Sequence, residues 1–218
     1  MGSERTGSIE HVGRSLVWSS KRIRLGVTTF EMSDSALNPR GQPIGTRVVV
    51  VGFAGAGKST FSRALAARTG LPLIHLDLQY WKPGWTHPAE DEWRDQQQAL
   101  VARDAWILDG NYVETLDLRL ERADTVVLLD TPWWRCAARS FVRGIRRPAG
   151  TQMPEGCEDS FTQRLRDEWG LVIAACRDRG REAEEVWAIA SRHGELPILY
   201  IARSKRDAAD LLDRLSVA

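Results

Sequence analysis

The stretch that decides the fold is VVVVGFAGAGKST, residues 48–60. Its four valines form a uniformly apolar run, which is typical of a strand covered on both faces. The residues from Gly52 to Thr60 fit the pattern G-x-x-x-x-G-K-[ST], and a helical pattern begins at Lys58, which is the context that this motif needs. A chance match in a chain of this length is roughly a 1% event. The stretch therefore predicts a strand, a phosphate-binding loop and a helix in succession.

The composition of this loop has a chemical reason. Glycines allow the backbone to turn its N–H groups inward onto phosphate oxygens, and the N-terminus of the next helix adds partial positive charge. Lys58 places a compact charge on the β- and γ-phosphates, the Ser59 hydroxyl is a Mg²⁺ ligand, and Thr60 reaches the α-phosphate side. The residues predicted to bind the nucleotide are Gly52, Gly55, Ala56, Gly57, Lys58, Ser59 and Thr60.

Beyond this loop, short apolar runs alternate with helix-like stretches. The strand-like runs are Val48–Val51, Leu73–Leu76, Trp106–Leu108, Thr125–Leu129 and Pro197–Ile201. The helix-like stretches are Lys58–Arg68, Ala89–Ala102, Thr115–Arg122, Pro132–Arg147, Asp159–Arg179 and Lys205–Leu215. This alternation predicts an α/β fold of the P-loop NTPase type, with a five-stranded parallel sheet and helices on both of its faces.

Three aspartates follow predicted strands, at the edge where open α/β sheets bind their ligands. Asp109 closes its apolar strand as a Mg²⁺-orienting carboxylate does, and with Ser59 it makes up the predicted metal site. Asp77 is placed to hold an acceptor hydroxyl or to act as its general base. Asp130 has the weakest functional case, because a helix start with Thr131 as the cap follows it. For each aspartate the alternative is a helix cap or a turn.

The segment between Thr131 and Pro154 contains no Asp or Glu, yet it carries five arginines: Arg135, Arg139, Arg143, Arg146 and Arg147. Four of them recur at intervals of four and so lie along one helical face. Like charges stacked in this way repel, and a triphosphate would offset them, because lid arginines stabilise charge on a transferring phosphoryl group. We therefore predict a helical arginine-rich lid over residues 135–160. A solvated basic face or a nucleic-acid contact is the alternative.

An aromatic loop, Tyr80-Trp-Lys-Pro-Gly-Trp85, follows Asp77 at the position where an acceptor would dock. Trp81 and Trp85 are predicted either to stack on a base or sugar or to anchor this loop on the protein body. His75 is expected to pack beside Asp77 rather than to take part in catalysis. The tryptophans expected in the core, because they lie in periodic segments, are Trp93, Trp106, Trp169 and Trp187.

The overall charge is nearly balanced, since 30 Lys and Arg face 29 Asp and Glu for a formal net charge of +1. This balance excludes a chain that is polycationic throughout. No apolar run approaches the roughly 18 residues of a membrane span, and the N-terminus has no apolar signal core, so a cytoplasmic location is expected. The three cysteines have no C-x-x-C spacing and no nearby histidine, so we expect reduced thiols.

The motifs together resemble a known family. From about Val48 to Leu215 the chain is similar to the nucleoside and nucleotide kinases of adenylate kinase-like fold, and within them to the DNA topology modulation (FlaR-like) proteins. The likeness rests on Gly52–Thr60, Thr69–Asp77, Trp81–Trp85, Trp106–Tyr112, Ala123–Asp130 and Arg146-Arg147-Pro148. It implies ATP and Mg²⁺ as cofactors and a small-molecule acceptor as the other partner.

The resemblance also implies roles for single residues. Arg139 would stack on adenine, whereas Arg143 and Arg164 would contact phosphate. One departure concerns the acceptor: Asn111-Tyr112 stands where adenylate kinases carry the arginine that binds their nucleotide acceptor. The likeness therefore does not extend to AMP as the acceptor.

Residues 1–46 differ from the rest of the chain, with seven Ser, six Gly and no sustained apolar period. We expect a flexible, disordered leader over 1–46 and a P-loop kinase-like domain over 47–218. A short strand within Ile23–Phe30 is compatible with the leader. A gene model that begins too early, upstream of Met32, is an alternative account of this segment.

Three functional hypotheses follow. The leading one is a Mg²⁺–ATP-dependent kinase or ATPase acting on an unidentified small acceptor, with catalytic residues Lys58, Asp77, Arg139, Arg143 and Arg164. The second is a DNA-associated topology-modulating or regulatory protein that uses nucleotide as a switch, although the sequence has no helix-turn-helix signal and no zinc finger. The third is a degenerate nucleotide-binding protein without turnover, which the intact Lys58, Ser59 and Asp109 argue against.

Overall fold

The computed structural model describes residues 44–145 and 197–214 and the backbone of 22–25 and 28–31. Between the two long ranges it describes residues 155, 157, 169–171, 173, 186 and 188–189. None of the helices within these ranges has the length and apolar character that crossing a bilayer requires.

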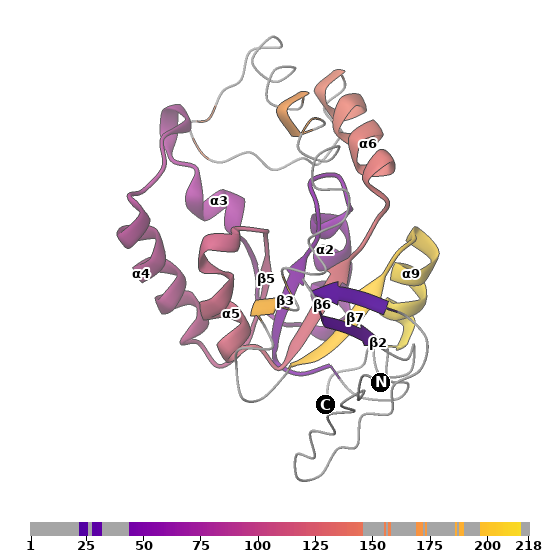
Figure 1. The fold of residues 1–218 in the computed structure, drawn as a ribbon. Helices are drawn as coiled ribbons and strands as arrows, with labels where there is room; N and C mark the ends of the chain where they lie inside the picture. Colours follow the sequence, from indigo (N-terminus) through magenta and orange to yellow (C-terminus); the bar gives the residue numbers. More distant parts are fainter. Residues whose placement is uncertain are drawn as a thin grey trace, which may run out of the picture.

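A five-stranded sheet forms the centre of the molecule (Figure 1). Its strands are β3 (Arg47–Val51), β4 (Leu73–His75), β5 (Trp106–Asp109), β6 (Thr125–Leu129) and β7 (Ile198–Ala202). The order is β4-β5-β3-β6-β7 and every neighbouring pair is parallel. Because the phosphate-binding loop follows β3, the central strand, its two neighbours β5 and β6 deliver their own following residues to the same edge of the sheet.

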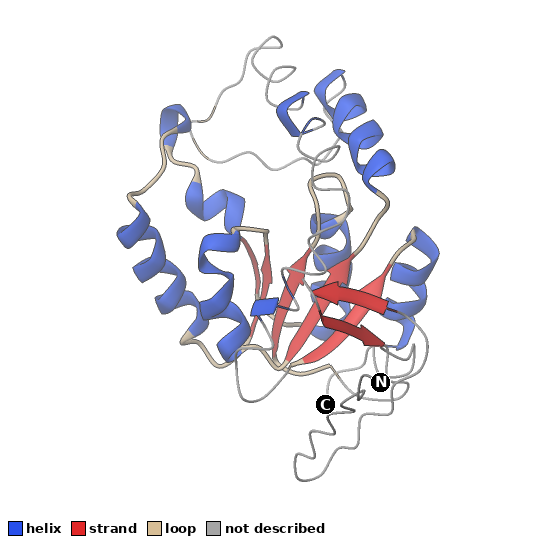
Figure 2. Cartoon of the chain, in the orientation of Figure 1, coloured by secondary structure: helices blue, strands red, loops and turns tan. Residues whose placement is uncertain are grey.

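Helices cover both faces of this sheet, as Figure 2 shows, and the predicted α/β P-loop fold is confirmed. The helices are α2 (Lys58–Thr69), α3 (Leu76–Tyr80), α4 (Glu90–Val101), α5 (Leu116–Arg122), α6 (Trp133–Ile145) and α9 (Lys205–Arg214). Two 3-10 turns are also present: η1 (Pro83–Trp85) lies between α3 and α4, and η2 (Val113–Thr115) lies between β5 and α5.

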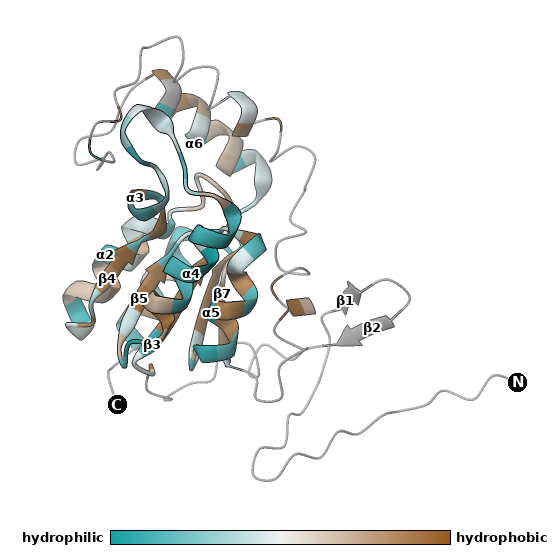
Figure 3. Ribbon diagram, turned by 90° about the vertical axis from the view of Figure 1, so that its left-hand side faces the viewer, coloured by the Kyte–Doolittle hydropathy of each residue, from teal (hydrophilic) through white to brown (hydrophobic). Residues whose placement is uncertain are grey.

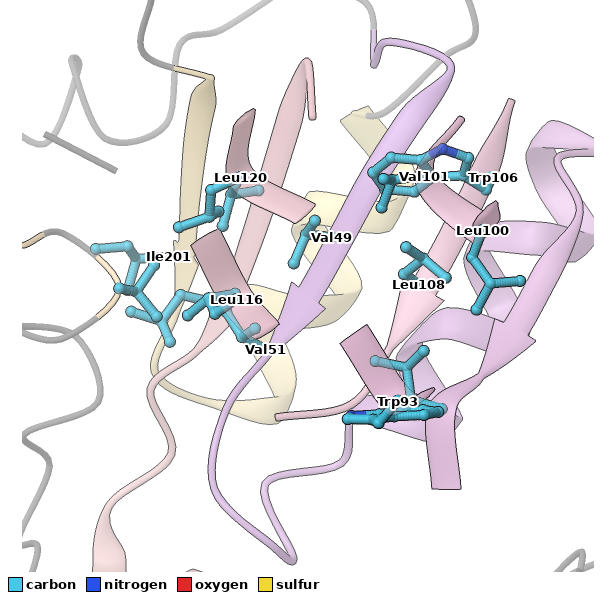
Figure 4. Close-up of a cluster of buried hydrophobic side chains, with 14 residues drawn as sticks. Val49, Val51, Trp93, Leu100, Val101, Trp106, Leu108, Leu116, Leu120 and Ile201 are labelled. Carbon is cyan, nitrogen blue, oxygen red and sulfur yellow. The ribbon is translucent and has the colours of Figure 1, made fainter. Parts of the chain in front are cut away.

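Alternate residues of the strands supply two hydrophobic cores. On one face, Val49 and Val51 of β3 pack with side chains of α4 and α5, among them Trp93, Leu100 and Leu116 (Figure 4). On the other face, Val48 and Val50 pack with side chains of α2 and α9. All four valines of β3 are fully buried, as the uniformly apolar run predicts. Figure 3 shows hydrophobic residues concentrated in the strands, whereas α3 and α4 are predominantly hydrophilic.

The N-terminal part of the described chain contains two further strands. β1 (Arg22–Leu25) and β2 (Thr28–Glu31) pair antiparallel, with Arg22 opposite Glu31. The packed body of the sheet includes Ile44, which is fully buried in the α2 face. Thr46 and Arg47 donate their backbone N–H groups to the carboxylate of Asp124, which ties the entry of β3 to the entry of β6.

Several details differ from the sequence-based expectations. Leu76 does not end a strand but begins α3, so Asp77 lies in the first turn of a short helix. Trp93 and Trp106 are buried as predicted, whereas the prediction for Trp169 is wrong, because this residue is 53% exposed. Its ring contacts Phe141, which is itself exposed. Trp187 lies outside the described residues.

Candidate active site at the carboxyl edge of the sheet

The phosphate-binding loop has the backbone geometry that its glycines allow. Gly55 and Gly57 have φ angles of 84° and 106°, in the left-handed region that side chains rarely adopt. Gly57 is also the N-cap of α2. A Cβ atom on Gly55 would lie 2.7 Å from the carbonyl oxygen of Cys136, so the loop and α6 approach each other more closely than any side chain permits.

The polar side chains of the motif lie at the start of α2. Lys58 folds back over the loop, and its Nζ donates to the carbonyl oxygens of Gly52 at 2.6 Å and Phe53 at 3.2 Å. Ser59 and Thr60 follow in the first turn of α2 and are both exposed. One short segment, residues 57–60, therefore contains the N-terminus of α2, the ammonium group of Lys58 and the hydroxyls of Ser59 and Thr60.

Asp109 ends β5 on the strand next to the loop, with its Cα paired to Val50 on one side and His75 on the other. The carboxylate is 4% exposed. Its Oδ2 lies 2.7 Å from Nδ1 of His75, a distance at which an Nδ1–H group donates to it. Its Oδ1 has no hydrogen-bond partner among the described residues. The pairing of β4 with β5 thus sets His75 beside Asp109, and the expected packing of His75 beside Asp77 stays a prediction.

The segment after Asp109 connects the loop to the acceptor side. The Oδ1 atom of Asn111 accepts a hydrogen bond from the backbone N–H of Gly52 at 3.4 Å. Arg119 of α5, which is fully buried, donates to the carbonyl oxygens of Gly110, Asn111 and Tyr112 at 2.7, 2.9 and 2.7 Å. Burial lowers the pKa of Arg119 to about 10. One guanidinium group therefore fixes the path of three successive residues.

Asp77, the predicted acceptor carboxylate, is exposed and lies beside this segment. Tyr112 Oη donates to its Oδ1 at 2.9 Å. Burial, and next the negative charge of Asp77, raises the pKa of the Tyr112 hydroxyl well above its ordinary value. The Tyr112 hydroxyl therefore stays protonated, and its hydrogen bond orients the carboxylate of Asp77.

On the other side of the loop, α6 carries the predicted lid arginines. Arg139 Nη1 donates to the carbonyl oxygens of Gly55 and Ala56 at 3.0 and 3.2 Å, which holds α6 against the phosphate-binding loop. Arg143 lies one turn further along α6 and is half-buried. Arg164 lies outside the described residues, as do Arg146 and Arg147.

Thr131 does not cap α6 as predicted. Its hydroxyl donates to the carbonyl oxygen of Ala56 at 3.2 Å, and the first turn of α6 instead bonds to the carbonyl of Pro132. Thr131 therefore links the phosphate-binding loop to the segment that follows β6. Asp130, for which a functional role had the weakest case, accepts from Nε of Arg203 at 3.3 Å.

These residues fit a magnesium–triphosphate group. The loop offers backbone N–H groups and a lysine for the phosphates, and Asp109 offers a buried carboxylate oxygen that no described residue occupies. Within the described part of the chain no cluster of three or more Asp, Glu, His or Cys could hold a metal ion on its own. A metal bound by one carboxylate, a hydroxyl and phosphate oxygens is the usual arrangement for Mg²⁺.

Comparison with known proteins finds a curated relative that matches part of the chain. No family model matches. A shikimate kinase from Bradyrhizobium diazoefficiens is 36% identical over 97 residues, a stretch that covers 38% of this chain and 45% of that enzyme. The chain thus spans less than half the length of this curated relative.

Three of the solved structures with a similar arrangement are kinases. Shikimate kinases from Acinetobacter baumannii, in complex with shikimate, and from Bacteroides thetaiotaomicron share 20% and 16% identity and give TM-scores of 0.43 and 0.44. These likenesses cover 79% and 78% of this chain and 90% and 95% of theirs. A sugar kinase from Janibacter sp. HTCC2649 shares 18% identity, covers 79% and 92%, and gives a TM-score of 0.40. At such scores the fold assignment rests on the strand order and the loop geometry, not on these likenesses.

The aromatic loop after Asp77 forms a connected set of rings. Trp81 and Trp85 meet edge to face with centroids 5.6 Å apart, and Tyr80 contacts Trp81 at 5.1 Å and Tyr112 at 4.8 Å. The loop closes on itself through the backbone bond from Lys82 to Thr86. Cys157, a buried residue of the predicted lid range, donates its thiol to the carbonyl oxygen of Lys82 at 3.1 Å. The two tryptophans therefore anchor each other, and both remain half-buried.

Sequence reasoning missed the roles of His75, Asn111, Tyr112 and Arg119. Arg119 did leave a signal, because it shares the buried face of α5 with Leu116 and Leu120 at helical spacing. A charged residue at such a core position needs internal partners. The other three roles depend on contacts across more than 30 residues of sequence, which no local pattern records.

Proposed function

We propose that this protein is a Mg²⁺–ATP-dependent phosphotransferase that acts on the hydroxyl group of a small acceptor. The observation that carries the proposal is the buried Asp109 carboxylate on the strand beside the phosphate-binding loop, which is hydrogen-bonded to His75 through one oxygen and has no partner among the described residues at the other. A buried carboxylate with a free oxygen is costly unless it binds a cation. The partial likeness to a shikimate kinase supports the same class of reaction.

Some residues of the chain bind the triphosphate and the metal, and another accepts the proton of the acceptor hydroxyl. Lys58 and the loop N–H groups neutralise and orient the triphosphate, and Ser59 and Asp109 hold Mg²⁺, which neutralises charge on the phosphate oxygens. Asp77 accepts the proton of the acceptor hydroxyl, whose oxygen forms the new bond to the γ-phosphorus as the bond to the ADP oxygen breaks. Arg143 and Arg164 stabilise charge on the transferred group, whereas Arg139 stacks on the adenine and holds α6 against the loop. Transfer to water, which is ATP hydrolysis, follows the same scheme.

Calorimetry with ATP, in the presence and absence of Mg²⁺, tests this proposal. We expect wild type to bind Mg²⁺–ATP and Lys58→Ala to bind it at least about ten-fold more weakly, because the loop loses its only lysine. Asp109→Asn keeps a hydrogen-bonding group of the same size, so it should lose the Mg²⁺-dependent part of the affinity and keep the metal-free part. Absence of binding by wild type, or equal binding by Lys58→Ala, would contradict the proposal.

DNA association, FlaR-like family membership and a cytoplasmic location stay predictions. The observation in favour of DNA is that residues 131–145 carry three arginines and no acidic residue. If DNA is the partner, duplex binding should weaken steeply with salt and with replacement of Arg143. A gel shift that finds no duplex binding at low salt rejects this alternative and leaves the phosphotransferase proposal intact.

A further inference from the structure

We infer that the acceptor is a polyhydroxylated ring compound without negative charge, such as a sugar, a cyclic polyol or a nucleoside. This inference rests on the proposed phosphotransferase activity and adds the chemical class of its substrate. It is carried by three observations around Asp77: the charge of the surrounding elements, the pairing of their basic side chains, and the rings of the aromatic loop.

The elements around Asp77 are acidic. Residues 76–119 contain nine Asp and Glu against four Lys and Arg, a formal charge of −5 in a chain whose total is +1. Three of these acids, Glu90, Asp91 and Glu92, lie in the first turn of α4. A phosphate or carboxylate group on the acceptor would be repelled by this part of the protein.

Three of the four basic side chains of this region already have partners. Lys82 Nζ pairs with Glu92 at 2.7 Å, and Arg94 pairs with Asp117 at 2.5 Å. The guanidinium group of Arg119 donates to the three backbone carbonyl oxygens named above. The fourth, Arg103, follows the far end of α4 and precedes β5, toward the opposite edge of the sheet. Within residues 76–119 no unpaired cation therefore faces an acceptor at Asp77.

The rings provide the contact that a neutral acceptor needs. A continuous set of ring contacts runs from Trp85 through Trp81 and Tyr80 to Tyr112, whose hydroxyl holds Asp77. Trp85 has a φ of 59°, a costly conformation for a bulky residue, and the Lys82–Thr86 backbone bond closes the loop around it. A ring compound can pack its C–H face on an indole while one of its hydroxyls donates to the carboxylate. The geometry therefore suits an alcohol that is apolar on one face and uncharged.

Matched acceptor pairs test the inference through acceptor-stimulated ADP release. Methyl shikimate is compared with shikimate and adenosine with AMP, and glucose and inositol serve as further neutral compounds that distinguish the kinds of ring. We expect kcat/KM for the neutral member to exceed that for the anionic member by about ten-fold or more. Equal or better use of the anionic members overturns the inference, and so does a panel in which no neutral alcohol stimulates ADP release. Mg²⁺–ATP calorimetry is independent of the acceptor, so it shows separately whether the proposed function itself fails.

Two variants test the charge and the rings separately. Glu92→Gln leaves Lys82 without its carboxylate, so it should improve kcat/KM for anionic acceptors by roughly three-fold or more and leave neutral ones unchanged. Trp85→Ala should raise the KM for neutral acceptors by about ten-fold without changing the KM for ATP. Trp134→Ala, which removes an exposed indole from α6, is the matched control and should change neither constant. An unchanged preference in Glu92→Gln, or an equal effect of the two tryptophan variants, counts against the inference.

Discussion

Arg119 organises the segment between Asp109 and Tyr112 from within the core. It is fully buried, and its guanidinium group satisfies the carbonyl oxygens of Gly110, Asn111 and Tyr112. These residues in turn lead from the Asp109 carboxylate to the hydroxyl that orients Asp77. A single side chain therefore couples the stability of the fold to the position of two carboxylates.

Replacement of Arg119 by methionine should lower the free energy of unfolding by roughly 3 kcal/mol, because it leaves three carbonyl oxygens without a donor. Arg122→Met, on the exposed end of the same helix, should change the free energy by no more than about 0.5 kcal/mol. Urea denaturation of the two variants and wild type provides the comparison. Equal stability of both variants would show that the buried guanidinium group does not hold this segment.

At the scale of elements, α6 approaches the phosphate-binding loop closely and is hydrogen-bonded to it. Arg139 and Thr131 both donate to carbonyl oxygens of the loop. Gly55 has no Cβ that would separate the loop from Cys136. The predicted lid helix is therefore attached at its base, and its arginines are placed by that attachment.

Two glycine variants separate backbone strain from this packing. In Gly55→Ala the new Cβ would lie 2.7 Å from a backbone oxygen of α6, whereas in Gly57→Ala nothing lies within 4 Å. Both variants carry the strain of a positive φ, about 1 kcal/mol, and only Gly55→Ala should add a packing cost of roughly 1–3 kcal/mol. Urea denaturation measures the difference. If the two variants lose the same stability, the approach of α6 is not a constraint.

At the scale of the whole molecule, the near-neutral total charge averages two regions of opposite sign. Residues 131–145 carry three arginines and no acid, whereas residues 76–119 have a formal charge of −5 from nine acidic and four basic side chains. Figure 1 shows α6 on one side of the molecule and α3 and α4 on the other. Under the proposed function, the basic side would face the nucleotide and the acidic side the acceptor.

This charge distribution predicts how salt affects the two substrates. Between about 0.05 and 0.5 M NaCl the KM for ATP should rise several-fold, because the screening length falls from roughly 14 to 4 Å. The KM for a neutral acceptor should stay constant over the same range. Initial rates measured with each substrate varied in turn give both constants. A parallel rise in the two KM values would contradict the separation of charge.

The fold and the strand–loop–helix succession around the phosphate-binding loop could be predicted because their signals are local. Among the described residues, the predicted strands and helices begin and end within about two residues of the observed ones. The exceptions have physical causes. Leu76 prolongs an apolar run, yet its side chain belongs to the first turn of α3. Thr131 has the residue type of a helix cap, yet the carbonyl of Ala56 competes for its hydroxyl.

By itself, the sequence determined the sheet, the phosphate-binding loop and the presence of carboxylates at its edge, because each is encoded in consecutive residues or in a short period. Only the tertiary structure decided that His75 belongs to Asp109, that Tyr112 holds Asp77, and that Arg119 is occupied by backbone oxygens. The first two contacts join residues that are 34 and 35 positions apart in the sequence, and the third involves a charged side chain in the core. Strand pairing and burial set them, because the pairing brings distant strand ends to one edge and burial leaves each polar group only the partners that lie within reach.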